Sequence, residues 1–168
     1  KVKCEEKLLK YKSDDFITTI IRPATVCGFS KRQRFDLVVN ILTNHGFNNG
    51  EIKVFGGSQL RPNINIKDMC NAYFHLINQE DNLINGEIFN VGFENYSVNY
   101  LADIVSRSLN KNVKVINVPT NDNRSYHISS EKIKKVLNFE TKYSIKSAIV
   151  DLKNAFETKI LSNTFDDI

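Results

Sequence analysis

The sequence predicts an α/β fold for this chain of 168 residues. A nearly continuous β-branched run at residues 16–21 is typical of a strand that is buried on both faces of a parallel sheet. Segments with helical spacing of apolar residues precede and follow this run. Strand-like and helix-like segments then alternate along the chain, which is the pattern of α/β proteins. The hydrophobic content of 41% is ordinary for a globular domain, so the chain can form a core.

The first predicted elements are a helix, a strand and a second helix. Residues 2–11 carry apolar positions among lysines and glutamates, which predicts an amphipathic helix. The strand at residues 16–21 ends in a loop at residues 22–28, where proline and glycine stop regular structure. Ligands of open α/β sheets bind beyond the carboxyl ends of such strands, so this loop is a candidate wall of a site. Residues 35–44 follow with helical spacing.

The stretch at residues 52–68 combines two strand-like segments with a turn and an arginine. Ile52, Val54 and Phe55 are strand formers and run into a pair of glycines, which permit backbone angles closed to other residues. Arg61 follows, and a second alternating segment ends at Asp68, which can cap a helix. This arrangement could present a cation to an anionic ligand. The alternative is a hairpin loop whose arginine is only solvated.

The rest of the chain is predicted to form four helices and two strands. Ser97 can cap the second of these helices, and a polar loop at residues 120–126 holds a single basic residue, Arg124. The helices are predicted at residues 68–77, 98–109, 131–137 and 145–160, and the strands at residues 87–92 and 113–118. The buried side of the first helix is predicted to consist of Met69, Ala72, Tyr73, Leu76 and Ile77.

The composition excludes several classes of protein. No apolar run approaches the ~20 residues that a membrane helix needs, and no signal peptide opens the sequence. We therefore expect a cytoplasmic protein that does not act at a membrane. The three cysteines form no CxxC pair, so reduced and mostly buried thiols are expected. His75 has no partner at metal-ligand spacing, and no metal site is predicted.

The net charge of +4 is a weak indication of anionic partners. Lysines are scattered among acidic residues, without the long basic stripe that duplex nucleic acid usually requires. The densest basic segment, at residues 31–34, could contact phosphates, and the alternative is a solvated loop. Binding of nucleic acid through this segment is the least favoured function, and no nucleic-acid partner is predicted.

Familiar catalytic signatures are missing from the sequence. It contains no GxSxG, HExxH or GxxxxGK[ST] motif and no GxGxxG after a strand. The chain therefore shows neither a phosphate-binding loop nor a dinucleotide fingerprint. Arg61 and Arg124 each lie in a polar loop between regular elements. Because a planar guanidinium offers paired donors that match phosphate oxygens, both arginines are candidates to bind a diphosphate.

Five segments occur in a characteristic order: RPATVCG, RFDLVVN, IKVFGGSQLRPNINIKD, GEIFNVG and NRSYHISSEKIKKVLNF. In this order they resemble the carboxy-terminal half of extended short-chain dehydrogenases/reductases. More narrowly, they resemble the NAD-dependent epimerase/dehydratase family that acts on nucleotide sugars, over almost the whole chain. The resemblance implies an incomplete Rossmann-type parallel sheet, made of its last strands and helices, plus a small α/β substrate-binding lobe.

The resemblance also implies how the chain is divided between the two units. Residues 1–28 would end the Rossmann domain, and residues 29–63 would form the first part of the substrate-binding lobe. Residues 64–93 would return to the Rossmann domain, and residues 94–168 would form the second part of the lobe. The glycine-rich NAD loop would lie before residue 1.

The family's catalytic motif is Tyr-x-x-x-Lys on a helix, and KVKCEE at the start of the chain fits the part that begins with the lysine. Lys1 would then be the catalytic lysine, which in the family holds the nicotinamide ribose of NAD and lowers the pKa of the tyrosine. The alternative is an ordinary exposed lysine on a helix. Pro23 matches the family's proline beside the nicotinamide. The tyrosine itself would precede residue 1.

The resemblance assigns further residues to the substrate. Phe35 and Asp36 stand where the family has a pair such as Asn-Leu, at the start of a helix that meets the substrate's phosphates. A carboxylate would repel a diphosphate, so Asp36 is expected to act through its backbone. Lys53 and Phe55 match the edge that meets the nucleotide base, and Arg61 matches the arginine that binds the diphosphate.

Four more positions follow from the same resemblance. Arg124 matches the family's second arginine, and Asp122 lies near the usual contact with the ribose or the sugar. Asn65 stands where many relatives have histidine, which is expected to alter a structural hydrogen bond. Cys27 replaces a frequent tyrosine, which is expected to reshape the sugar pocket.

The function implied by the resemblance is hydride transfer between a sugar carbon, commonly C4, and a tightly held NAD, with the tyrosine as general base. We expect the chain to be the carboxy-terminal portion of a nucleotide-sugar epimerase or dehydratase, to be inactive alone, and to form a homodimer. The alternative is a non-catalytic module that binds nucleotide sugars or another subunit.

Overall fold

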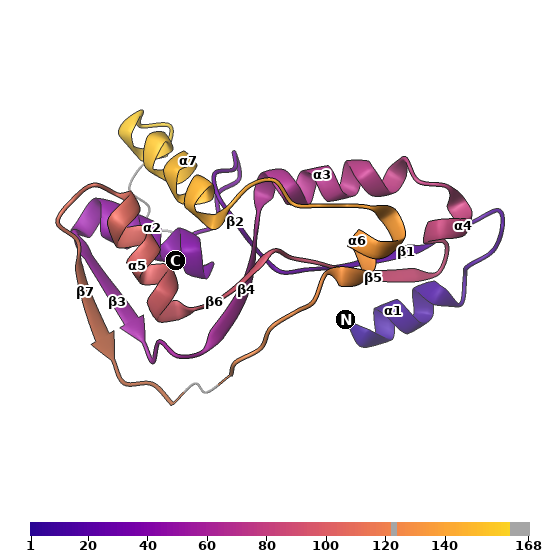
Figure 1. Ribbon diagram of the computed structural model, residues 1–168, viewed down its shortest axis with the longest axis horizontal. Coiled ribbons are helices and arrows are strands. Elements are labelled where there is room, and N and C mark those ends of the chain that lie inside the picture. Colours follow the sequence, from indigo (N-terminus) through magenta and orange to yellow (C-terminus); the bar gives the residue numbers. More distant parts are fainter. Residues whose placement is uncertain (122–123, 162–168) are drawn as a thin grey trace.

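The strands of the protein form three small sheets in a computed structural model that describes residues 1–121 and 124–161 (Figure 1). Two sheets are parallel pairs: β1 (Thr19–Pro23) with β5 (Glu87–Val91), and β3 (Glu51–Phe55) with β7 (Lys114–Val118). In the third sheet, β4 (Leu60–Asn65) lies between β2 (Thr25–Cys27), to which it is parallel, and the antiparallel β6 (Glu94–Ser97). The predicted α/β class is confirmed.

The helices gather around the two parallel pairs, at opposite ends of the molecule (Figure 1). Beside the β3–β7 pair, three helices pack together: α2 (Val38–Asn49), α5 (Val98–Ser108) and α7 (Ile145–Glu157). Around the β1–β5 pair lie α1 (Val2–Leu9), α3 (Ile66–Ile77), α4 (Asp81–Ile84) and α6 (Glu131–Leu137). The β2–β4–β6 sheet connects the two ends.

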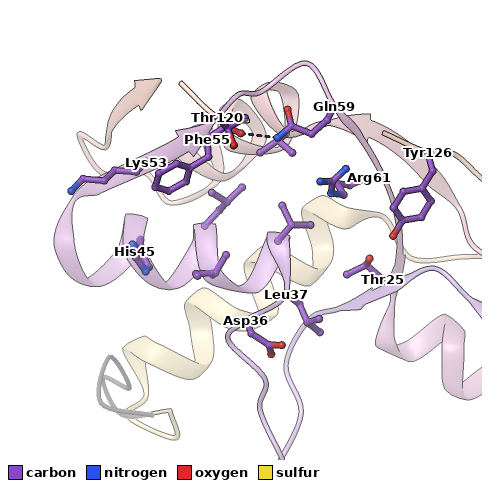
Figure 2. Close-up of a pocket in the computed structure, with 14 residues that line it drawn as sticks. Thr25, Asp36, Leu37, His45, Lys53, Phe55, Gln59, Arg61, Thr120 and Tyr126 are labelled. Carbon is purple, nitrogen blue, oxygen red and sulfur yellow. Dashed lines mark hydrogen bonds between the residues drawn. The ribbon is translucent and has the colours of Figure 1, made fainter. Parts of the chain in front are cut away.

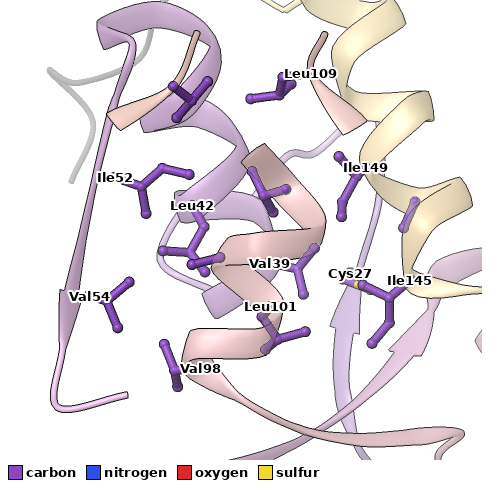
Figure 3. Close-up of a cluster of buried hydrophobic side chains, with 14 residues drawn as sticks. Cys27, Val39, Leu42, Ile52, Val54, Val98, Leu101, Leu109, Ile145 and Ile149 are labelled. Carbon is purple, nitrogen blue, oxygen red and sulfur yellow. The ribbon is translucent and has the colours of Figure 1, made fainter. Parts of the chain in front are cut away.

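One core fills the space between α2, α5, α7 and β3 (Figure 3). Side chains of β3 alternate, so Ile52 and Val54 are completely buried in this core while Lys53 and Phe55 point outward. Leu101 of α5 is also completely buried. The core includes Cys27, Val39, Leu42, Val98, Val105, Leu109, Ile145 and Ile149. This packing fixes the positions of α2 and β3, which form two walls of the site described below.

A second core lies around β5 and includes Ile64, Met69, Ala72, Leu76, Phe89, Val91, Ile133 and Leu137. Met69, Ala72 and Leu76 are buried on α3 as predicted. The prediction was wrong for Tyr73 and Ile77, which are 52% and 73% exposed. The side chains of these two residues point to solvent. The stripe of α3 that packs on the core is narrower than the number of apolar residues in the helix suggests.

The amino-terminal cap of α3 differs from the prediction. Asn65 is the cap residue, and its side-chain oxygen accepts a hydrogen bond from the Lys67 N–H at 2.9 Å. Asp68 lies inside the helix and is fully buried, where its carboxylate accepts hydrogen bonds from the backbone N–H groups of Lys142 (2.9 Å) and Tyr143 (2.8 Å). Asp68 therefore anchors the segment before α7. The predicted cap of α5 is confirmed, since Ser97 accepts a hydrogen bond from the Tyr100 N–H.

The first strands also differ from the prediction. β1 begins at Thr19, and Phe16 is 53% exposed in a turn closed by hydrogen bonds with Ser13. The predicted loop at residues 22–28 contains β2, which is only three residues long. A strand of three residues is too short to show a period in the sequence. Its hydrogen-bond partners in β4 are distant along the chain, so no local pattern indicates the pairing either.

The hairpin suggested for residues 52–68 does not form. β3 pairs with β7, whereas β4 pairs with β2 and β6. The glycine turn between the strands has the positive φ angles expected of it, 76° at Gly56 and 113° at Gly57. A Cβ atom on Gly57 would also lie 2.1 Å from Oδ1 of Asn99, so this turn requires glycine for space as well as for backbone angle.

Several smaller details were not predicted. The sequence did not indicate β6 or the short α4, and α2 begins at Val38 rather than at residue 35. Cys27 is buried, but Cys4 and Cys70 are exposed, so the expectation of mostly buried thiols was wrong. Burial raises the pKa of the Cys27 thiol to about 12.

Candidate functional site

A pocket of about 560 Å³ opens between α2, β3 and the start of β4 (Figure 2). Its surface combines apolar side chains with a few polar and charged groups, as ligand sites commonly do. The described residues that line it are Thr25, Asp36, Leu37, Val38, Ile41, Leu42, His45, Lys53, Phe55, Gln59, Arg61, Val98, Thr120 and Tyr126.

One wall is a face of α2. Val38, Ile41, Leu42 and His45 recur at intervals of three or four residues and therefore lie on the same side of the helix. His45 is partly buried at the end of this wall, near Lys53 (Figure 2). Burial, and secondly the positive charge of Lys53, lower the pKa of His45 below its ordinary value of 6.5. The neutral imidazole is therefore favoured at pH 7.

The opposite wall is the outward face of β3. Lys53 and Phe55 line the pocket because Ile52 and Val54, which alternate with them, are held in the core. Phe55 is 55% exposed and presents its ring to the pocket (Figure 2). Lys53 lies 3.9 Å from a carboxylate oxygen of Glu51, an exposed and weak ion pair.

Gln59 fixes the turn that joins β3 to β4. Its side-chain oxygen accepts a hydrogen bond from the Gly57 N–H, and its amide nitrogen donates to the Phe55 carbonyl, both at 2.6 Å. The two bonds close the turn from inside. The closed turn therefore fixes how far Phe55, at the end of β3, lies from Arg61, on β4.

Arg61 lies at the other end of the pocket, beside Tyr126 (Figure 2). Its Nη1 donates hydrogen bonds to the carbonyl oxygens of Leu60 (3.0 Å) and Arg124 (2.5 Å). The guanidinium carbon lies 5.9 Å from the centre of the Tyr126 ring, within the range of a cation–π contact. Carbonyl groups and an aromatic ring thus orient this cation.

Asp36 lines the pocket where the chain enters α2. Its carboxylate accepts hydrogen bonds from the Arg34 guanidinium, at 3.1 Å from Nε and 2.6 Å from Nη2. This pairing lowers the pKa of Asp36. Phe35, its neighbour, is buried and stacks on Phe156 with ring centres 6.0 Å apart. Phe35 supports the wall from behind and is not among the described lining residues.

The pocket places two cations, Lys53 and Arg61, on either side of an aromatic and apolar surface. An anionic group would be attracted to either cation, and a flat ring could pack on Phe55. The arrangement suits an elongated ligand that has both a planar and an anionic part.

A sequence model of the NAD dependent epimerase/dehydratase family matches residues 1–92, more than half of the 168 residues. The chain belongs to this family. The family that the order of sequence segments predicted is thereby confirmed.

Solved structures show the same fold. Pal from Bacillus thuringiensis superimposes with a TM-score of 0.79 and 23% identity, over 95% of this chain and 52% of that chain. UDP-glucose 4-epimerase from Thermotoga maritima, solved with UDP-glucose, gives 0.79 and 21%, over 96% and 53%. UDP-glucuronic acid 4-epimerase from Bacillus cereus, in complex with UDP-glucuronic acid and NAD, gives 0.71 and 19%, over 84% and 45%. The chain spans about half the length of these structures.

Four of the residues assigned to the substrate by family resemblance lie together in the pocket: Asp36, Lys53, Phe55 and Arg61. Arg124 is exposed and is not among the described lining residues; its backbone carbonyl contacts Arg61. Asp122 lies outside the described residues. Cys27 is buried in the first core, where its thiol donates a hydrogen bond to the Ile64 carbonyl.

The residues assigned to the cofactor lie elsewhere. Lys1 is exposed and precedes the first turn of α1, and Pro23 is the exposed last residue of β1. Neither is among the described residues that line the pocket. An ion pair at the surface connects Arg22 of β1 with Glu5 of α1, with Nε of Arg22 3.1 Å from the glutamate.

Sequence reasoning did not single out Thr25, His45, Gln59, Thr120 or Tyr126 as site residues. For His45 a signal existed, since it continues the apolar spacing of Val38 and Ile41 along α2. Tyr126 stands in a loop, where no periodicity indicates which side chains face a cavity. Its position depends on contacts with β4, which is distant along the chain.

Two features are absent from the part of the chain that the structure describes. Within it, no group of three or more His, Cys, Asp or Glu side chains could hold a metal ion. None of its helices is both long and apolar enough to cross a membrane.

Proposed function

We propose that this chain is the substrate-binding portion of an NAD-dependent nucleotide-sugar epimerase or dehydratase, in which NAD transiently oxidises a sugar carbon, commonly C4. The observation that carries the proposal is the single pocket shared by Asp36, Lys53, Phe55 and Arg61. Further support comes from two structures of the same fold, which contain UDP-glucose and UDP-glucuronic acid.

In this proposal the nucleobase lies against β3. The exposed ring of Phe55 offers a flat apolar surface on which a base can pack, and Lys53 lies beside it. His45 faces the same end of the pocket from α2 (Figure 2). Because its neutral form is favoured, His45 can both donate and accept a hydrogen bond there.

The diphosphate lies at the Arg61 end. A guanidinium group matches phosphate oxygens with paired N–H donors, and the fold already orients this one. The Asp36 carboxylate is bound to Arg34, which offsets the repulsion that a bare carboxylate would exert on a diphosphate. Contact through the backbone of Asp36 remains the expected role of that residue.

Lys1 and Pro23 are the residues proposed to meet NAD. They supply one exposed ammonium group and one proline at the carboxyl end of a strand, which is too little to hold a dinucleotide. The two residues do not make a complete cofactor site. In the proposed enzyme, the rest of the NAD site would come from the half of the fold that residues 1–168 do not span.

Domain boundaries and a homodimer belong to the same proposal. The lobe formed by residues 29–63 and 94–168 is supported by the first core, which draws on α2, β3, α5 and α7. α6 instead packs in the second core. A dimer through α1 is supported by its surface, because no residue of that helix is buried. Sedimentation of the 168-residue protein as a monomer would argue against the dimer.

Calorimetric titration with UDP-, GDP-, CDP- and dTDP-sugars tests the binding function. At least one of these ligands should bind the wild-type protein, and Phe55→Ala should weaken that binding. A matched control is Phe74→Ala, because Phe74 is also exposed (67%) but lies on α3 and is not a described lining residue. If none of the four classes binds, or if both variants weaken binding equally, the site is wrongly assigned.

A further inference from the structure

Several hydrogen bonds attach the segment at residues 124–130 to β4, β6 and the residue after β5. The side-chain amide of Asn95, on β6, makes two of them with the backbone of Ile128, at 2.9 and 3.1 Å. Farther along, Ser130 Oγ accepts a hydrogen bond from the Gly92 N–H at 2.8 Å. The end of the segment at residues 128–130 is therefore fixed.

The other end of this segment lies on the first two residues of β4. β2 pairs only with Asn63 to Asn65, so Leu60 and Arg61 extend past its end. At that point Ser125 Oγ accepts a hydrogen bond from the Leu60 N–H at 2.9 Å. The carbonyl of Arg124 accepts from Arg61, and the ring of Tyr126 lies over its guanidinium. Residues 124–126 thus contact Leu60 and Arg61, the first two residues of β4.

We propose that Tyr126 is a positioning residue, which holds Arg61 in the orientation that binds a diphosphate before the ligand arrives. The proposal rests on the proposed function and adds a role for a residue that the sequence did not indicate. Tyr126 acts through Arg61, with the Arg124 carbonyl as the second support.

The physical reason is the conformational freedom of arginine. A long arginine side chain loses rotamer freedom when it binds a ligand, which reduces affinity. Carbonyl acceptors fix one edge of the Arg61 guanidinium, and the Tyr126 ring lies beside the group, with the ring centre 5.9 Å from the guanidinium carbon. Because this order exists in the unliganded fold, less freedom is lost on binding.

The first test examines Arg61 without any ligand. In the wild-type protein, the ¹⁵N–¹H signal of Arg61 Nε should show the relaxation of an ordered side chain. Tyr126→Leu should make that signal mobile, and Tyr126→Phe should preserve the order because the ring is retained. Tyr73→Leu is the matched control, since Tyr73 on α3 is 52% exposed and Tyr126 is 51% exposed. Because Tyr126 is exposed, Tyr126→Leu should keep the fold, and circular dichroism checks this.

The second test uses whichever of UDP, GDP, CDP and dTDP binds tightest, with the matching nucleoside as comparison. Tyr126→Leu should weaken binding of the diphosphate about 2- to 10-fold, the size expected for loss of one cation–π contact. Its effect on the nucleoside, which lacks phosphates, should be smaller. In an Arg61→Ala background, Tyr126→Leu should have no further effect on the diphosphate, because the residue acts through Arg61.

The outcomes separate the two proposals. Failure of every nucleotide to bind the wild-type protein contradicts the proposed function, while the relaxation of Arg61 still decides whether Tyr126 positions it. An ordered Arg61 in Tyr126→Leu overturns the positioning role. Equal losses for diphosphate and nucleoside, persisting in the Arg61→Ala background, overturn it as well and assign Tyr126 a direct contact with the ligand.

Discussion

Arg61 donates a hydrogen bond from Nη1 to the backbone carbonyl of Arg124, at 2.5 Å. The sequence indicated two equivalent arginines, each ready to bind a phosphate through its side chain. In the structure, Arg61 lines the pocket, whereas Arg124 contributes its carbonyl to the support of Arg61. The two arginines are therefore expected to differ in their importance for binding.

Replacing each arginine by alanine tests this difference. Arg61→Ala should weaken binding of a nucleoside diphosphate about 10- to 100-fold, as expected for loss of hydrogen bonds to a charged group. Arg124→Ala should have a smaller effect, because it keeps the carbonyl that supports Arg61. Calorimetric titration measures both affinities. Arg107→Ala is the control, since Arg107 pairs with Asp103 on α5 and is not a described lining residue. Equal losses for Arg61→Ala and Arg124→Ala would contradict the asymmetry.

The sequence predicted most elements of the fold because their local patterns are strong. Ile52, Val54 and Phe55 are strand formers, and the helical spacing around Leu101 is regular, so β3 and α5 could be located. The pairing of strands could not be predicted in this way. β2 has three residues, and its partners lie in β4, so its existence depends on contacts that no local window contains. The cap of α3 was misplaced because Asn65 and Asp68 are both good caps.

The candidate site, like the fold, could be predicted only in part from the sequence. Family resemblance indicated Lys53, Phe55 and Arg61, and the structure brings these three together in one pocket. The assignments of Lys1 and Pro23 stay predictions. Tyr126 could not be found from local pattern, because its place beside Arg61 depends on a contact between residues 65 positions apart.

Burial of Leu101 predicts a large loss of stability on truncation. Leu101 is completely buried in the first core, so Leu101→Ala should lower the free energy of unfolding by about 2–5 kcal/mol. Leu83→Ala makes the same chemical change on α4, where the side chain is 37% exposed, and should cost much less. Urea denaturation followed by circular dichroism measures both. Similar midpoints for the two variants would contradict the described core.

The buried carboxylate of Asp68 predicts a second loss of stability. It accepts hydrogen bonds from two backbone N–H groups, of Lys142 and Tyr143, which Asp68→Ala would leave without this acceptor. The expected loss is about 1–3 kcal/mol or more. Asp103→Ala breaks an exposed pair with Arg107 and should cost less than about 1 kcal/mol. Urea denaturation again compares them, and an Asp68→Ala protein as stable as the control would show that this anchor contributes little.

The environment of His45 predicts a pH effect with a definite sign. Burial, and secondly Lys53, lower its pKa from 6.5, so the folded protein binds fewer protons at this site than the unfolded chain does. This contribution to stability is therefore present above pH 6.5 and is lost as the pH falls toward the pKa of the folded state. An NMR titration of the His45 ring should give a pKa below 6.5. Lys53→Met should raise that pKa only in part, because burial is the larger cause. Lys132→Met, which removes a lysine paired with Glu87, should leave it unchanged. A fall in the pKa of His45 on removal of Lys53 would contradict the described geometry of this end of the pocket.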